Sequence, residues 1–464
     1  MRLHLLRNFR LWRREVRPTL ALALPIMAGM VSQMLMGLAD TIMIGHVGVV
    51  PLAASSIVNA VAHLPLVFGM GLLSSIAVLT AQAYGARKPD DAGEILRHGL
   101  VVSAIMGLLA ALSMVALHPF LHQLGQPPEV VAEAGNYLLL FGASMFPAMV
   151  AHGCKQFAEA LKHPWAPTVV MLGSVLLNVL LNWILIFGHW GAPAMGLDGA
   201  GWATVIARVV MALVLLVYVL RSPKLRAYQP ARWRAAWSGL RFQNLLRLGW
   251  PVAGQHFCEV SAFAFAVVMM GWISADAMAA HQIAITCAAL TFMFVLGLGA
   301  ATCIRVGHAF GAGQFARMRR IGLGAVALAA GIMAVFGVMF VVAGRPIAHL
   351  FITSPAVVDL AAQLLIVAAI FQIADGVQVT SISALRGLSD VRVPALIAVL
   401  AYWVLAVPLG LLLGFPAKWG AIGIWVGLAT GLGVAAVGLA WRFHWQTCRV
   451  SLNPSLKRHG RNLK

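Results

Sequence analysis

The stretch Phe371–Gly387, FQIADGVQVTSISALRG, places a carboxylate, Asp375, inside an apolar segment that is long enough to span a membrane. A carboxylate near the centre of a bilayer costs about 3 kcal/mol on insertion scales, so it normally faces a polar interior and serves a pathway. Asp375 precedes the basic turn at Arg386 by about 16 Å at the helical rise, which is roughly half a bilayer. The spacing therefore predicts an ionisable group near the membrane midplane.

Apolar runs of spanning length recur along the whole chain. Of its 464 residues, 61% are hydrophobic and only 10% are charged, which excludes an ordinary soluble domain. The pattern predicts an all-α polytopic membrane protein with twelve spans. These lie at about residues 18–45, 52–83, 98–117, 131–154, 166–187, 199–220, 249–272, 279–304, 321–344, 356–385, 393–413 and 421–441.

The basic residues predict the orientation. If the spans alternate, all but three of the 33 Lys and Arg residues fall on one side, the exceptions being Arg208, Arg345 and Lys418. By the positive-inside rule both termini are cytoplasmic, as expected for a protein of the bacterial inner membrane. The net charge of +19 comes from short clusters that flank spans, so we expect contact with membrane lipids and no nucleic-acid partner.

Two basic ends complete the predicted domain organisation. Residues 1–17 alternate leucine and aromatic residues with arginine, which fits a basic amphipathic helix on an anionic leaflet or, equally, an unstructured tail. Residues 442–464 form a basic cytoplasmic tail. Between them we place an N-terminal six-helix bundle at 18–220, a basic cytoplasmic connector at 221–248, and a C-terminal six-helix bundle at 249–441.

The two predicted bundles repeat one another. At an offset of 226 residues Pro25 matches Pro251, Gly45 matches Gly271, and Gly85-Ala86 matches Gly311-Ala312. Because each bundle has an even number of spans, the halves share one orientation. The sequence therefore predicts a parallel pseudo-two-fold repeat about an axis along the membrane normal.

Glu259 is the second acid that we expect inside the membrane. It follows Arg247 by about 18 Å of helix, so Glu259 and Asp375 should occupy the same layer of the second bundle. Two carboxylates at one depth in a low dielectric resist ionising together, so they could share a proton or bind a small metal cation such as Na⁺. A structural hydrogen bond between helices is the alternative for each acid.

The first bundle carries different chemistry at the matching places. Asp40 is expected in its outer part and has Ala266 as its counterpart, whereas Gln33 stands where Glu259 stands in the other half. His256 precedes Glu259 by three residues and so shares its helical face, as a proton partner or a packed histidine. Phe371, one turn before Asp375, could offer its ring face to a cation or simply pack.

The sequence around these acids resembles that of a known family. The stretches LADTIMIGHVG with Asp40, FCEVSAFAF with Glu259, ADGVQVTSISALRG with Asp375, and GSVLLNVLLNWILIFG with Asn178 and Asn182 resemble the multidrug and toxic compound extrusion (MATE) family, over nearly the whole chain. The placement of Glu259 is similar to its NorM branch. That branch often carries tyrosine where Phe371 stands, so the ring is kept and a hydroxyl is lost.

The resemblance implies a cation-coupled antiporter. It implies export of small cationic lipophilic compounds by alternating access, driven by Na⁺ or H⁺ bound at Glu259 and Asp375. It further implies that Asp40 acts in coupling or drug binding and that Asn178 is a polar residue of the first bundle. Gln33, His256 and Phe371 are added as candidate drug-binding or coupling residues because of their positions in the sequence. No other cofactor is expected, and no GxxxxGK[ST] loop is present to use ATP directly.

Other functions stay open at this point. A flippase for lipid-linked sugars should line its cleft with basic residues for phosphates, but only Arg208 lies within a span. An intramembrane enzyme is disfavoured because HExxH is missing and Gly37-Leu38-Ala39-Asp40 lacks the pattern GxGD. A channel is disfavoured because paired acids on unlike bundles form no ring. We expect a monomer, since the pair of bundles is self-contained.

Overall fold

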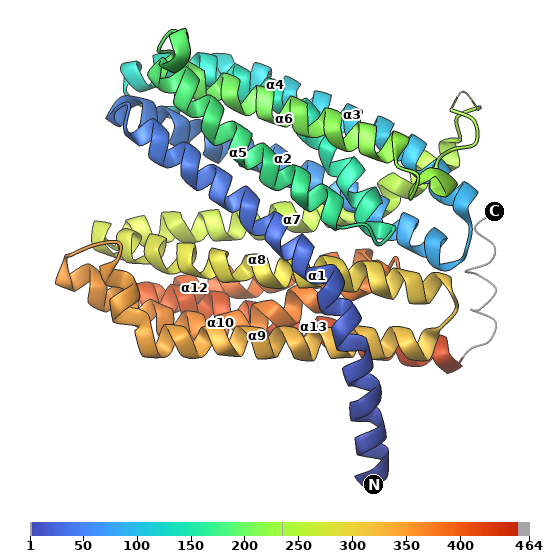
Figure 1. The fold of residues 1–464 in the computed structure, drawn as a ribbon. Coiled ribbons are helices and arrows are strands. Elements are labelled where there is room, and N and C mark those ends of the chain that lie inside the picture. The colour runs from blue at the N-terminus through green and yellow to red at the C-terminus, as the bar shows by residue number, and fades with distance from the viewer. Residues whose placement is uncertain (1, 234, 453–464) are drawn as a thin grey trace. The chain divides into compact units, whose positions relative to one another are not determined.

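A computed structural model describes the backbone of residues 2–233 and 235–452 (Figure 1). The side chains of residues 2–13, 124 and 450–452 are not described, so the predicted amphipathic face of residues 1–17 lies largely outside the described residues. The same holds for residues 453–464 of the predicted basic tail. The backbone of the N-terminal segment from Arg2 is helical and continuous with the first span.

Over these described ranges every regular element is helical and twelve helices are apolar and long enough to span a membrane, which confirms the predicted fold class. The helices of the first half are α1 (Arg2–Gly45), α2 (Val49–Gly85), α3 (Pro89–Leu117), α4 (Pro128–Ala160), α5 (Trp165–Phe187) and α6 (Gly196–Arg221). Those of the second half are α7 (Gly239–Ile273), α8 (Ala275–Gly311), α9 (Phe315–His349), α10 (Pro355–Gly387), α11 (Arg392–Val399), the π-helical segment Leu400–Ala406, α12 (Val407–Gly414) and α13 (Gly420–Leu452).

The helix ends follow the sequence repeat. Helices α2 and α8 begin and end 226 residues apart, and α3 and α9 begin at the same offset. The turn after α2 places Arg87 in the left-handed region at φ 57°, and the turn after α8 places Gly313 there at φ 70°. Glycine adopts this conformation freely, whereas a residue with a side chain pays about 1 to 2 kcal/mol. The two turns therefore share one geometry that only the second half satisfies without strain.

Backbone contacts divide the chain into two compact units, which are described separately. We call residues 28–253 the A unit. Its central helix is α4, which packs against α2, α3 and α6, while α5 packs against α6. The part of the connector after α6 is tied to α3: Arg97 donates to the carbonyl oxygens of Ala235 at 2.7 Å and Ala236 at 3.0 Å.

We call residues 1–27 together with 254–464 the B unit. Its central helix is α10, the counterpart of α4 in the repeat, and it packs against α8, α9 and α13. Small buried residues such as Ala361 and Ala368 allow these helices to approach closely, as is usual in membrane bundles. The span between α10 and α13 is interrupted by the π-helical segment ahead of Pro408, a distortion that is frequent at functional sites.

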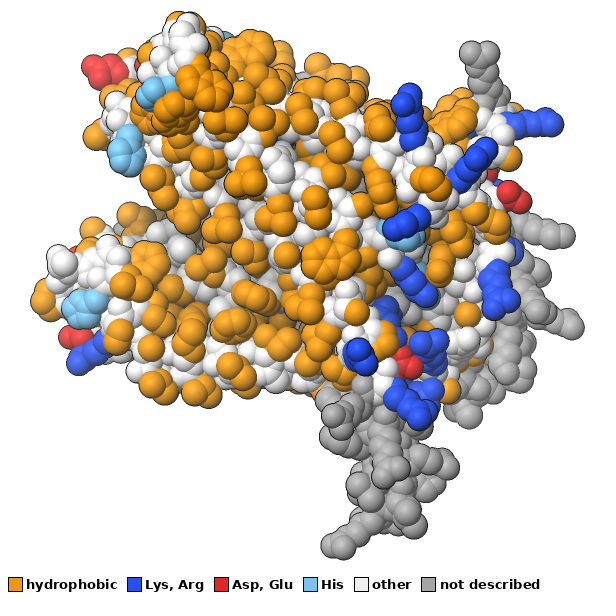
Figure 2. Space-filling model, in the orientation of Figure 1, with side chains coloured by type: hydrophobic (Ala, Val, Ile, Leu, Met, Phe, Trp, Pro, Cys, Tyr) orange, Lys and Arg blue, Asp and Glu red, His pale blue; other side chains and the backbone are white. Residues whose placement is uncertain are grey.

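The surface is typical of a protein embedded in lipid. On the face drawn in Figure 2, hydrophobic side chains cover the middle of the helices of each unit, and Lys and Arg side chains gather toward one end of them. Exposed apolar residues such as Leu176, Val342 and Val437 are more than 70% exposed, which a soluble domain seldom tolerates in such numbers. The chain is a multi-pass membrane protein.

Three basic residues that the predicted span boundaries place in or beside connectors are buried. Arg97, Lys155 and Arg305 each lie within a helix and are at most 7% exposed. Arg305, for example, is paired with Glu15 and hydrogen-bonded to Thr19. In addition, α7 begins at Gly239, so the last third of the predicted connector at 221–248 is helical. The division into bundles at 18–220 and 249–441 itself stays a prediction.

Candidate functional sites

Glu259 and Asp375 are brought together in the B unit by α7 and α10. Asp375 is 7% exposed and the side chain of Glu259 is 12% exposed. The two carboxylates are near enough to interact electrostatically. Neither carboxylate forms an ion pair with Lys or Arg within the described part of the chain. Two negative side chains in one apolar layer therefore share no direct positive partner.

Tyr402 joins these acids from the π-helical segment. Its hydroxyl donates to Glu259 Oε1 at 3.1 Å and lies 3.5 Å from Gln378 Oε1, and it interacts electrostatically with Asp375 as well. Tyr402 is 1% exposed and Gln378 is fully buried. Gln378 lies one turn after Asp375 on α10, so both face the same neighbours. We call Glu259, Asp375, Gln378 and Tyr402 the acid site.

A single guanidinium lies at the edge of the acid site. Arg386 Nη2 donates to Gln255 Oε1 at 2.8 Å and lies 3.3 Å from His256 Nε2. The other ring nitrogen of His256 is 3.9 Å from Glu259 Oε2. His256 therefore lies between Arg386 and Glu259. The guanidinium acts on Glu259 through space rather than through a direct bond.

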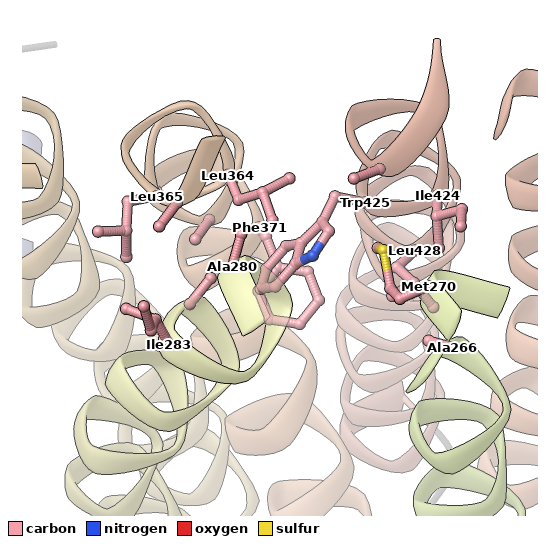
Figure 3. Close-up of a cluster of buried hydrophobic side chains, with 14 of the residues drawn as sticks. Ala266, Met270, Ala280, Ile283, Leu364, Leu365, Phe371, Ile424, Trp425 and Leu428 are labelled. Atoms are coloured by element: carbon pink, nitrogen blue, oxygen red, sulfur yellow. The ribbon is translucent and has the colours of Figure 1, made fainter. Parts of the chain in front are cut away.

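Phe371 lies in the apolar layer next to the acid site. Its ring is 3% exposed and contacts Phe263 and Trp425 edge to face, with ring centroids 6.0 Å and 5.7 Å apart. Figure 3 shows Phe371 and Trp425 at the centre of a cluster to which α7, α8, α10 and α13 contribute. Such edge-to-face contacts are ordinary core packing. The geometry favours the packing interpretation of Phe371 over a ring face open to a cation.

The donor set of the acid site suits a hard cation or a proton. It consists of carboxylate, carboxamide and hydroxyl oxygens, and oxygen ligands are those that hard cations prefer. Within the residues that the structure describes, no group of three His, Cys, Asp or Glu side chains is placed to hold a metal ion. The oxygens of the acid site suit a hard cation or H⁺, whereas zinc prefers nitrogen and sulfur ligands.

Asp40 belongs to a separate polar cluster in the A unit. Asn182 Nδ2 donates to Asp40 Oδ1 at 2.6 Å and lies 3.3 Å from Asn178 Oδ1. Asn178 and Asn182 are fully buried, one turn apart on α5. Asp40 of α1 is thus hydrogen-bonded to the asparagines of α5, a contact that was not predicted from the sequence. We call Asp40, Asn178, Asn182 and Arg208 the mixed-charge cluster.

Arg208 enters this cluster from α6. Its Nη1 donates to Ser144 Oγ at 2.8 Å, and its guanidinium carbon lies 4.8 Å from the ring centre of Phe141. Arg208 interacts electrostatically with Asp40 and with Tyr137, which is 2% exposed. Arg208 and Asp40 are both partly buried, and no direct ion pair joins them within the described residues.

Gln33 lies outside both sites, whereas Tyr402 and Arg208, which were not predicted as site residues, belong to them. Gln33 is exposed, two turns before Asp40 on α1, and takes no part in the mixed-charge cluster. Tyr402 was missed because nothing in its local sequence, AYWVLA, indicates a polar neighbour. Arg208 was noticed only as a basic residue within a span, although an intramembrane charge calls for a partner of opposite sign.

Comparison with known proteins identifies the family. The MatE family model matches twice, over residues 25–184 and 251–412, once in each half of the repeat. The chain is 36% identical to the probable multidrug resistance protein NorM of Mesorhizobium japonicum, over 93% of this chain and 94% of the relative. It is 37% identical to the protein of the same name from Brucella suis biovar 1, with the same coverage.

The fold is shared with solved structures. The structure matches that of the Vibrio cholerae MATE transporter VcmN with a TM-score of 0.87 over 95% of this chain and 98% of that one, at 22% identity. At 22% identity this similarity supports a shared fold only. The relatives at 36 and 37% identity show the family and its NorM-like branch. This agrees with the resemblance of the four stretches quoted from the sequence. The chain belongs to the MatE family.

Proposed function

We propose that the chain is a multidrug efflux transporter that exports small cationic lipophilic compounds in exchange for Na⁺ or H⁺. Its relatives carry the name of multidrug resistance proteins, and members of the family are transporters rather than enzymes. The observation that carries the coupling proposal is the acid site: two buried carboxylates that no Lys or Arg of the described chain neutralises directly.

The charges around the acid site suggest how many cations it binds. Glu259 and Asp375 contribute two negative charges when ionised, and Arg386, held at its edge through Gln255 and His256, contributes one positive charge. One negative charge remains in an apolar layer, where an unpaired charge is unfavourable. A single Na⁺ or a single proton restores neutrality, so we expect one coupling cation per cycle.

The oxygen atoms of the acid site suggest a role for each of its residues. Glu259 and Asp375 would hold the coupling cation, with Tyr402 and Gln378 as further oxygen ligands for Na⁺. Asp40, with Asn178 and Asn182, would serve the drug or its coupling. Binding of cation and drug to alternative states of the transporter provides the exchange, because each ligand shifts the equilibrium toward the state that binds it better.

The proposal includes a location in the inner membrane with both termini in the cytoplasm. The bacterial relatives and the clustering of Lys and Arg side chains at one end of the helices support a place in the inner membrane with cytoplasmic termini. We further propose a monomer in contact with membrane lipids, with Na⁺ or H⁺ as the only cofactor-like ion. Natural substrates are proposed by chemical class alone.

The test is ethidium efflux from proteoliposomes under an imposed Na⁺ gradient and, separately, an imposed pH gradient. Wild type should export ethidium under one of them, and Asp375→Asn should not, although it reaches the membrane. Asp359→Asn is the matched control, since Asp359 lies on the same helix but is paired with Arg345 at an exposed end. Normal efflux by Asp375→Asn would refute the site. If neither gradient moves ethidium in wild type, export of lipid-linked sugars becomes the leading alternative.

A further inference from the structure

Arg386, at the edge of the acid site, contacts two neutral side chains of α7 and no carboxylate within the described part of the chain. Its Nη2 donates to Gln255 Oε1 at 2.8 Å and lies 3.3 Å from His256 Nε2. Its Nε is buried without a hydrogen-bond partner. A guanidinium placed here without a carboxylate in contact is unfavourable unless its neighbours use its charge. Both neighbours reach toward Glu259.

Arg386 sets the direction in which the amide of Gln255 faces. A guanidinium has N–H donors and no acceptor, so Gln255 must turn its carbonyl oxygen toward it. The amide N–H₂ of Gln255 is then left for Glu259, to which the side chain is hydrogen-bonded. Gln255 is 3% exposed, so water cannot easily take the place of either partner.

The same reasoning fixes the tautomer of His256. The ring nitrogen that faces the guanidinium, Nε2, must be an acceptor, so the single N–H of the neutral ring is on Nδ1. Nδ1 lies 3.9 Å from Glu259 Oε2. A movement of about 1 Å would bring it to an ordinary hydrogen-bond length. Arg386 thus directs a second N–H toward the same carboxylate.

These N–H donors and a cation act on Glu259 in opposite ways. N–H donors stabilise the ionised carboxylate when no cation is bound. A cation binds the lone pairs of the same carboxylate oxygens, and an N–H cannot ligate it. The donors therefore favour the state without the cation, whereas the Tyr402 hydroxyl, which has lone pairs of its own, can join either state.

We propose that Arg386 is a positioning residue for release of the coupling cation: it directs the N–H groups of Gln255 and His256 to Glu259, where they replace the departing cation. The inference rests on the proposed role of Glu259 in coupling and deepens it. Without these donors the ion-free acid site would keep its negative charge uncompensated, and the cation would be held too tightly for rapid exchange. All four side chains belong to the B unit.

Cation binding to the purified transporter tests this role without transport. Trp403 provides the signal, because its indole N–H donates to the carbonyl oxygen of Cys258, the residue before Glu259, at 3.0 Å. Its fluorescence is followed during a Na⁺ titration at fixed pH and a proton titration without Na⁺, and Trp403→Phe identifies its contribution. The other titratable groups around Glu259 and Arg386 are Asp375, Tyr402 and Cys303.

Arg386→Gln should lower the cation concentration at the midpoint by roughly tenfold, the effect of about one hydrogen bond to a charged group. Loss of a residue that only supports the fold would instead weaken cation binding. Arg386→Lys keeps the charge and the donors and should restore much of the wild-type midpoint. Arg392→Gln is the control for loss of a positive charge at an exposed position, with a midpoint within about twofold of wild type.

A double variant shows whether Arg386 acts through its two neighbours. Gln255→Leu/His256→Phe removes both N–H donors and should itself tighten cation binding, which keeps the test available if Arg386→Gln does not fold. Adding Arg386→Gln to this double variant should change the midpoint by less than about threefold.

Three results would overturn the proposal. The first is cation binding that is unchanged or weaker in folded Arg386→Gln. The second is the full tenfold effect of Arg386→Gln in the double variant, since Arg386 would then act as a bare charge. The third is a wild type that shows neither transition. If wild type shows a transition but does not export ethidium, drug export is refuted and the role of Arg386 stands.

Discussion

Replacing Tyr402 by phenylalanine should separate the two possible coupling ions. The substitution removes the hydroxyl that donates to Glu259 at 3.1 Å and keeps the ring, which packs beside Phe263 with centroids 6.0 Å apart. A hydrogen bond to a charged group contributes about 1.5 to 3 kcal/mol, which corresponds to roughly tenfold to hundredfold in an equilibrium constant. The packing contribution should change little, because only one oxygen is lost.

The direction of the effect depends on the ion. If the site binds Na⁺, the variant loses an oxygen ligand, and the Na⁺ concentration for half-maximal efflux should rise by roughly tenfold or more. If the site binds H⁺, the hydroxyl stabilises the ionised carboxylate in wild type, so its removal favours the proton-bound form. The proton concentration for half-maximal efflux should then fall.

The assay is ethidium efflux from proteoliposomes, measured over a series of Na⁺ concentrations at fixed pH and over a series of pH values without Na⁺. Glu259→Gln and the double variant Glu259→Gln/Tyr402→Phe complete a cycle that isolates the interaction of the two side chains. In that cycle Tyr402→Phe should have little effect once Glu259 is gone. Unchanged dependence on both ions in Tyr402→Phe would refute the assignment of Tyr402 to the acid site.

Two other predictions concern stability and orientation. Glu15→Gln should lower the free energy of unfolding by about 2 to 3 kcal/mol, because it leaves the buried Arg305 without its ion-pair partner and also removes the ion pair with Arg317 at 3.0 Å. Thermal unfolding in detergent measures this change, and a loss no larger than that of Asp359→Asn would contradict it. A reporter fused to the C-terminus that is active only outside the cytoplasm should stay silent, since the basic ends of the helices favour the cytoplasm; activity of that fusion would contradict the proposed orientation.

The sequence predicted the helices well because lipid imposes a simple rule on them. A span must be apolar over about twenty residues, so its position can be read from composition along the chain. The repeat was readable for a related reason: matching turns such as Gly85-Ala86 and Gly311-Ala312 mark the same helix ends. Depth in the membrane follows from counting residues, which is how Glu259 and Asp375 were assigned to one layer.

The same counting could not show which side chains meet. Contact depends on the rotation of each helix about its axis and on the order in which the helices pack. Neither can be inferred from the local sequence. Tyr402 meets Glu259 across 143 positions of sequence, and Asn182 meets Asp40 across 142. The burial of Lys155 and Arg305 was missed for another reason. A charge near the end of a span can be solvated, so its burial cannot be inferred from its position. Here Arg305 is paired with Glu15 of α1, and Lys155 lies 3.9 Å from Glu159 on its own helix.

The repeat gives the two units comparable helices and unlike chemistry, and the difference in charge suggests a division of labour. In the B unit the carboxylates of Glu259 and Asp375 outnumber the one nearby guanidinium, so a small cation completes the site. In the A unit Asp40 accepts a hydrogen bond from Asn182 and has the cation Arg208 within electrostatic reach, so no excess negative charge is left there. If coupling and drug binding are divided in this way, Asn182→Ala should weaken drug efflux while leaving the dependence on the coupling ion unchanged, because it removes the hydrogen bond to Asp40. A variant at Tyr402 should do the reverse.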